Sequence, residues 1–205
     1  SDLKKLMPFL GLEGHPEGRF FPDTYLFTGN TRASEILVRA QVRLESVLAQ
    51  EWQKREEHLP YKTPYEALIM ASIVEKETAA VEEREQIAGV FVRRLQKNMR
   101  LETDPTVIYG LGDRYKGNIR RKHLREKTAY NTYRMKGLPP SPISLVGREA
   151  IYAALHPADD ETLYFVAKGD GRHYFSSTLK EHNKAVREYQ INKRKKNNYR
   201  STPVK

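Results

Sequence analysis

The sequence predicts an α+β fold, in which a helical layer surrounds one apolar central helix and a small antiparallel or mixed sheet is added. Three observations favour this fold class. Apolar residues recur at helical spacing over 31–58, a nearly all-apolar segment follows over 64–78, and two β-rich segments flank the Gly-Asp-Gly turn at 169–171. The turn predicts a hairpin, and the two apolar patterns predict packed helices.

Length and composition favour one domain. The chain has 205 residues, of which 39% are hydrophobic, and this is enough for one sizeable core. We expect the domain to cover 1–192 and the basic, apolar-poor stretch 193–205 to be a disordered tail. No apolar run approaches the roughly 18 residues that span a bilayer, so we expect the chain as given to be soluble and to be cut from a longer protein.

The first two helices have clear signals. The amphipathic pattern over 31–58 predicts the first helix. The second is predicted to begin after Thr63, which can cap it, with Pro64 in the first position and Glu66 closing a capping box. The preceding segment 8–30 is predicted to be irregular and anchored by its aromatic residues, which are Phe20, Phe21, Tyr25 and Phe27.

The later elements are shorter. A third helix is predicted from Glu82 to a left-handed terminator at Asn98, and 99–144 is expected to hold short elements and long loops. A short helix over 148–155 should stop at the His-Pro pair that follows, and after the hairpin a last helix should open with a capping box at Thr178.

Two carboxylates end the apolar second helix, Glu75 and Glu77. Burial in such surroundings raises the pKa of a carboxyl group, which is what a general acid requires. Because residues two apart point to nearly opposite sides of a helix, these two cannot serve one cleft. Hydrophobic surroundings leave either residue open as the acid. The alternative is a frayed helix end with both carboxylates in water.

Two further groups of polar residues suit sugar hydroxyls and amides. The first lies on a short turn and contains Asp104, Thr106 and Tyr109. In the alternative interpretation, Asp104 merely caps this turn through the proline that follows it. The second contains Tyr130 and Asn131, where an amide between aromatic rings can hydrogen-bond a sugar while the rings stack on it. The alternative here is an ordinary packed loop.

The charge balance favours an anionic partner. The chain has 36 Lys and Arg against 26 Asp and Glu, for a formal net charge of +10. Basic residues crowd 114–136, but no helix-turn-helix, zinc-finger spacing or RNA-binding signature accompanies them, so we expect no specific nucleic-acid binding. The absence of cysteine excludes a thiol nucleophile and a thiolate metal site, and the six histidines show no paired metal spacing. We therefore expect no metal and no cofactor.

Several motifs together resemble one known family. They are residues 17–25 (EGRFFPDTY), 71–78 (ASIVEKET), 103–110 (TDPTVIYG), 130–133 (YNTY) and 137–140 (GLPP). In this order they resemble the YceG-like family of endolytic murein transglycosylases, and the resemblance extends over about 13–189. It implies that 1–192 is the catalytic domain and that the catalytic acid/base is the second glutamate of the IVEKE string, Glu77. The residues implied for substrate binding are Asp104, Thr106, Tyr109, Tyr130 and Asn131.

The resemblance also implies a reaction, a partner and a location. The substrate would be the glycan strands of peptidoglycan, cut without water to leave 1,6-anhydro ends, and the parent protein would terminate nascent strands. An N-terminal membrane anchor outside this chain would hold it at the periplasmic face of the bacterial inner membrane, with cell-wall synthases as candidate partners. The alternatives are a non-catalytic module that binds peptidoglycan or polyanions, and an enzyme of the same fold that hydrolyses the bond.

Overall fold

The structure is a computed structural model of the chain and describes residues 7–8 and 16–192. The predicted tail 193–205 and part of the irregular segment predicted over 8–30 lie outside the described residues. Among the helices of the described part, none is long and apolar enough to cross a membrane.

The core is built around α3 (Pro64–Glu77), as the apolar run predicts. The Thr63 hydroxyl caps it by accepting the Glu66 amide at 3.2 Å. The Glu66 carboxylate accepts the amide of Lys62 at 2.5 Å instead of that of Thr63, so the predicted capping box closes one residue earlier. Residues 67–74 are all buried, because the helix is covered around most of its circumference.

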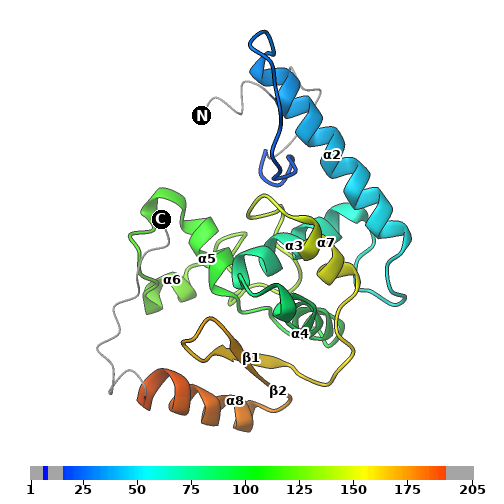
Figure 1. Cartoon of the computed structure of the whole chain (residues 1–205). Coiled ribbons are helices and arrows are strands. Elements are labelled where there is room, and N and C mark those ends of the chain that lie inside the picture. The colour runs from blue at the N-terminus through cyan, green and yellow to red at the C-terminus, as the bar shows by residue number, and fades with distance from the viewer. Residues whose placement is uncertain (1–6, 9–15, 193–205) are drawn as a thin grey trace.

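The helices that pack on α3 include α2 (Ala33–Gln53), α4 (Arg84–Gln96) and α7 (Arg148–Leu155). In Figure 1, α3 lies in the middle of the fold, while α2 leans out from it toward the top. The α7 helix has the predicted bounds, whereas α2 is shorter at both ends than the predicted 31–58. A 3₁₀ turn, η2 (Val81–Glu83), precedes α4. The chain leaves α4 through Asn98, whose φ of +53° is left-handed as predicted.

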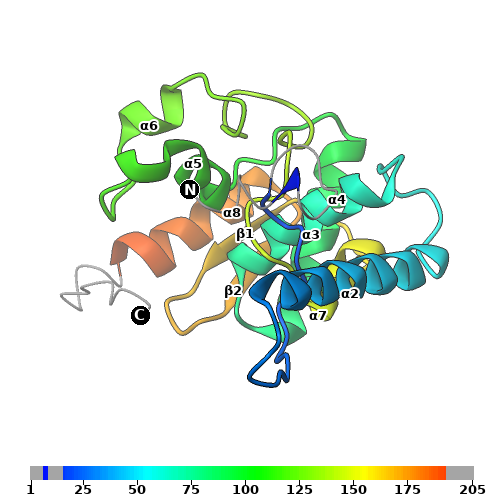
Figure 2. The ribbon, with the colours of Figure 1, turned by 90° about the horizontal axis from the view of Figure 1, so that it is seen from above.

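The region after α4 has short helices separated by loops, which confirms the prediction for 99–144. These are α5 (Asp104–Leu111), the 3₁₀ turn η3 (Gly112–Arg114) and α6 (Arg121–Arg125). The view in Figure 2 places α5 and α6 together at one side of the fold, away from α2.

The predicted hairpin is present and is the whole sheet of the described residues. Its strands, β1 (Tyr164–Ala167) and β2 (His173–Ser176), are antiparallel, with Ala167 opposite His173. The hairpin packs on α4, and α8 (Leu179–Val186) packs on the hairpin before the chain passes into a π-helical turn, η4 (Arg187–Asn192). The capping box predicted at Thr178 is confirmed. The α+β fold class is therefore confirmed.

One predicted anchor is wrong. Phe20 and Phe21 are buried, as expected for anchors, but Phe27 is 68% exposed. It precedes a tight turn in which the Thr31 amide donates to the Thr28 carbonyl at 3.0 Å. The turn carries the loop tip away from the core, so Phe27 has no apolar surface to cover.

Candidate active site

Glu77, the last residue of α3, lines a cavity of about 410 Å³. We call this the Glu77 cavity. Its other walls come from α4, from residues 101–104, from Tyr133, and from the hairpin with α8. Figures 1 and 2 show the hairpin and α8 lying together on one side of α4. The end of the central helix therefore opens into a space that distant parts of the chain enclose.

The Glu77 carboxyl accepts a hydrogen bond at its Oε2 from the Thr103 hydroxyl, 2.7 Å away. The pKa of Glu77 is raised above its ordinary value, chiefly because burial penalises the charged form. The hydrogen bond from Thr103 and the positive charge of His173 lower this pKa, and the negative charge of Asp104 raises it. A desolvated carboxyl beside a cavity is suited to holding a proton and delivering it to a ligand.

Glu75 has different surroundings. Its Oε1 pairs with the Arg84 guanidinium at 2.9 Å, and its Oε2 accepts the Gly147 amide at 3.1 Å. These bonds tie the end of α3 to the starts of α4 and α7. The structure thus separates the two carboxylates that the sequence left equivalent, because Glu75 is occupied in packing while Glu77 faces the cavity. Neither belongs to a frayed helix end in water.

Asp104 and Tyr133 form another part of the wall of the Glu77 cavity. The Tyr133 hydroxyl donates to Asp104 Oδ1 at 2.8 Å. Burial, followed by the charge of Asp104 and this hydrogen bond, raises the pKa of Tyr133, which keeps its proton for that bond. The structure places Thr103 at the N-cap position of α5, with Asp104 inside the first turn. Asp104 is therefore not the cap of this helix, and its carboxylate borders the cavity.

Two of the residues predicted to bind substrate are inside the protein. Thr106 is fully buried, and its hydroxyl donates to the Thr103 carbonyl at 2.8 Å. Asn131 is 1% exposed, and its amide nitrogen donates to the carbonyls of His123, Leu124 and Glu126 at 3.1, 3.3 and 2.6 Å. In this state both side chains organise the surrounding loops, and neither lines the Glu77 cavity.

Tyr109 and Tyr130 form a separate aromatic pair. Their ring centroids are 4.8 Å apart, and the Tyr130 hydroxyl shares a hydrogen bond with Ser141 at 2.6 Å. Both rings are partly exposed, but neither lines the Glu77 cavity. Of the predicted site residues, the structure therefore brings Glu77 and Asp104 to one cavity. Tyr109 and Tyr130 lie beside each other elsewhere, and Thr106 and Asn131 lie in the interior.

Other residues of the Glu77 cavity were missed by the sequence analysis as site residues. On the hairpin side, His173 lines the cavity and its Nδ1 pairs with Glu83 Oε2 at 2.8 Å. On the α4 side, Arg94 pairs with Glu102 at 2.9 Å. Tyr133 could have been singled out, because it belongs to the motif 130–133. By contrast, nothing in the local sequence indicates that the hairpin, and His173 with it, folds over the end of α3.

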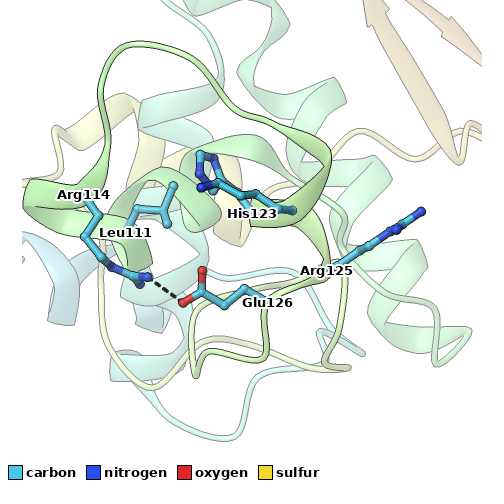
Figure 3. A pocket seen from close by; sticks show the side chains of 6 residues that line it. Leu111, Arg114, His123, Arg125 and Glu126 are labelled. Carbon is cyan, nitrogen blue, oxygen red and sulfur yellow. Dashed lines mark hydrogen bonds and ion pairs between the residues drawn. The ribbon is translucent and has the colours of Figure 1, made fainter.

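A second hollow lies in the basic segment that the sequence singled out. This basic hollow, of about 570 Å³, is lined by Leu111, Arg114, Lys122, His123, Arg125 and Glu126. Figure 3 shows its ion pair, in which Arg114 Nη1 and Glu126 Oε1 are 2.7 Å apart. Glu126 is the one acidic residue of this lining, against Arg114, Lys122 and Arg125, so the hollow is positively charged. The described residues contain no group of three or more His, Cys, Asp or Glu that could hold a metal ion.

The structure is an α+β domain in which the carboxyl at the end of the central helix, that of Glu77, lines a cavity. The model of the YceG-like family matches residues 2–188, and the chain belongs to this family. The resemblance stated from the motifs is thereby confirmed.

The family relationship extends to curated proteins and to a solved structure. The chain is 39% identical over 183 residues to the endolytic murein transglycosylase of Bacillus subtilis (strain 168), covering 89% of this chain and 50% of that protein. It is 31% identical to the endolytic murein transglycosylase of Streptococcus pneumoniae serotype 2, covering 84% of this chain and 32% of that protein. The crystal structure of a putative yceG-like protein from Listeria monocytogenes matches with a TM-score of 0.73 and 38% identity, over 89% of this chain and 62% of the other. The chain thus spans about half or less of the length of these curated relatives.

Proposed function

We propose that this chain is the catalytic part of an endolytic murein transglycosylase, with Glu77 as its acid and then its base. The observation that carries the proposal is the desolvated Glu77 carboxyl, whose raised pKa and position at the cavity suit a proton donor. The names of the related proteins support the substrate, which is the glycan strand of peptidoglycan.

In the first step, protonated Glu77 donates to the oxygen that links N-acetylmuramic acid to N-acetylglucosamine. The bond between this oxygen and the muramic anomeric carbon breaks, and its electron pair stays on the oxygen of the departing sugar. Positive charge develops on the muramic ring, where the acetamido group of the same sugar can stabilise it. Glu77 is left as a carboxylate that accepts the Thr103 hydrogen bond.

In the second step, the 6-hydroxyl oxygen of the muramic acid attacks its own anomeric carbon. The hydroxyl proton passes to the Glu77 carboxylate, which returns to its starting state. The product ends in 1,6-anhydro-N-acetylmuramic acid, and no water is consumed. One carboxyl therefore suffices for both proton transfers, because it acts as acid and base in turn.

Hydrolysis is the second candidate, and Asp104 is the observation that favours it. Hydrolytic glycosidases use a pair of carboxyl groups, and Asp104 lines the same cavity as Glu77. However, the Tyr133 hydroxyl already donates to Asp104 Oδ1, so this carboxylate is already engaged by the protein. We therefore assign Asp104 to holding the sugar through its other oxygen and favour the reaction without water.

The reaction is tested by incubating the protein with purified, uncrosslinked glycan strands in water enriched in ¹⁸O and reading the new ends by mass spectrometry. Transglycosylation yields anhydro ends without ¹⁸O, whereas hydrolysis yields reducing ends that carry it. Strands that stay intact while they bind the protein would support the non-catalytic binding module instead.

We also propose a setting for the longer parent protein, on the strength of the family resemblance. An N-terminal anchor outside this chain would hold the catalytic part at the periplasmic face of the inner membrane, where it would terminate nascent strands beside cell-wall synthases. Membrane fractionation of cells producing the full-length protein, followed by crosslinking, tests both the location and these partners.

A further inference from the structure

Several contacts hold the backbone and side chain of His173, a residue of the short hairpin. Glu83 accepts its backbone amide at Oε1, 3.0 Å away, and faces its ring Nδ1 with Oε2 at 2.8 Å. The two side chains are only 10% and 12% exposed. The Phe165 ring packs edge-on against the imidazole, with centroids 5.4 Å apart. The imidazole is therefore held by a carboxylate on one side and by an aromatic ring on another.

This fixed ring borders the Glu77 cavity. Because Nδ1 is turned toward Glu83, the opposite part of the ring, with Nε2, is left for the cavity; no hydrogen bond joins Nε2 to another described residue. A carboxylate that binds one ring nitrogen sets which nitrogen carries the proton and holds the ring in one orientation. Glu83 thus fixes the orientation of the His173 imidazole at the edge of the cavity.

We propose that His173 is a positioning residue for the Glu77 reaction, held by Glu83 so that it stabilises the carboxylate that Glu77 becomes after it has donated its proton. This inference rests on the proposed function and adds to it. His173 gives up no proton in the reaction, since the proton that Glu77 loses goes to the glycosidic oxygen and the one that it regains comes from the 6-hydroxyl.

The other charged groups around Glu77 leave this role open for His173. Asp104 disfavours the Glu77 carboxylate, and the Thr103 hydroxyl favours it through one hydrogen bond. On α4, Arg94 is engaged by Glu102 at 2.9 Å and by the Leu101 carbonyl at 2.9 Å. The positive charge of His173 lowers the pKa of Glu77, which is the direction that the role requires.

The test measures the pKa of Glu77 directly, by ¹³C NMR of protein labelled at the glutamate side-chain carboxyls. The Glu77 signal is the one that disappears in Glu77→Gln. In His173→Gln, which removes the imidazole, we expect this pKa to rise by about one pH unit. His173→Phe keeps an aromatic ring beside Phe165, so it preserves the packing and should show the same rise.

The matched control is His156→Gln. His156 is also a largely buried histidine beside a glutamate, with Nδ1 3.5 Å from Glu56, but it does not line the Glu77 cavity. We expect this variant to leave the pKa of Glu77 unchanged. An unchanged Glu77 pKa in both His173 variants would overturn the proposal, because a merely structural histidine has no effect on that value.

The pH dependence of strand cleavage is a second test of the role of His173. The alkaline limb of the rate of anhydro-end formation reports the loss of the Glu77 proton, so it should move to higher pH in both His173 variants, with a maximal rate about tenfold lower. A lower rate with an unmoved limb would contradict the role. If the unaltered protein cuts no strands, the proposed function fails for this chain, and the NMR titration still decides the role of His173.

Discussion

At the scale of single residues, the pKa of the Glu77 carboxyl depends on a balance. Burial favours the protonated form, whereas the Thr103 hydrogen bond and the electrostatic influence of His173 favour the charged form. Such a site is expected to reduce the stability of the fold, because the charged carboxylate is desolvated. The balance has consequences for stability and for the pH dependence of activity.

The first prediction concerns stability in Glu77→Gln. The pKa of Glu77 is raised above its ordinary 4.5, so the folded state binds this proton more tightly than the unfolded state does. That contribution is fully present below about pH 4.5 and is lost as the pH rises through the raised value. Glutamine has no charge to desolvate, so the variant should be more stable than the unaltered protein at pH 8 by about 1 kcal/mol. Urea unfolding should show the difference shrinking at pH 5, and an equal difference at both pH values would contradict the account.

The second prediction concerns Thr103→Val. Thr103 is 2% exposed, and valine fills nearly the same volume without the hydroxyl that donates to Glu77 at 2.7 Å. Loss of this bond disfavours the carboxylate, so the alkaline limb of strand cleavage should move to higher pH and the rate should fall about tenfold. A pH profile of anhydro-end formation measures both effects. A profile that keeps its position would show that the hydroxyl does not act on Glu77.

At the scale of the elements, Glu75 joins the end of α3 to α4 and α7 through Arg84 and the Gly147 amide. The third prediction is that Glu75→Ala lowers the free energy of unfolding by about 2 kcal/mol, because the Arg84 side chain, only 10% exposed, loses its close partner. Chemical denaturation measures this loss. Normal stability combined with a loss of cleavage would instead place Glu75 in the chemistry.

The fourth prediction concerns the loop that carries α6. The Asn131 side chain donates hydrogen bonds to three backbone carbonyls within residues 123–126, so Asn131→Ala should leave these carbonyls without their buried donor. We expect a loss of about 2 kcal/mol in stability and faster proteolysis between α6 and residue 131. Limited proteolysis with mass mapping locates the cuts. Equal rates in variant and parent would mean that the loop is held by other contacts.

The elements also show what the sequence could and could not predict. The start of α3, the bounds of α7 and the cap of α8 follow from neighbouring residues, so local patterns predicted them. The roles of Glu75 and Glu77 depend on Arg84 and Thr103, which are 9 and 26 residues away from them along the chain. The family resemblance favoured Glu77, whereas helix periodicity had no means of separating the two residues.

His173 illustrates the same limit. The hairpin that carries it was predicted from its turn, but its position at the Glu77 cavity depends on a contact with Glu83, which is 90 residues earlier. Asn131 shows the converse case, because its polar side chain and aromatic neighbours predicted a sugar contact, while its actual partners are nearby carbonyls of the same loop. Residue type alone does not distinguish a ligand contact from a loop contact.

At the scale of the whole molecule, the net charge of +10 and the basic hollow favour weak attraction to any polyanion. The fifth prediction is that duplex DNA binds only at low ionic strength and is released by about 200 mM salt, as expected for contacts with phosphates alone. A gel shift across a salt series measures this release. Tight binding that persists at high salt, or that depends on the DNA sequence, would favour a nucleic-acid function instead.

The most direct test of the central claim compares Glu77→Gln with Glu75→Gln on purified glycan strands, with the ends read by mass spectrometry and folding checked by circular dichroism. We propose proton transfer for the Glu77 carboxyl, which lines the cavity, whereas the Glu75 carboxyl is bound by Arg84. Glu77→Gln should therefore be folded and make no anhydro ends, while Glu75→Gln should be less stable and still make them. Anhydro ends from folded Glu77→Gln at the normal rate would contradict the account.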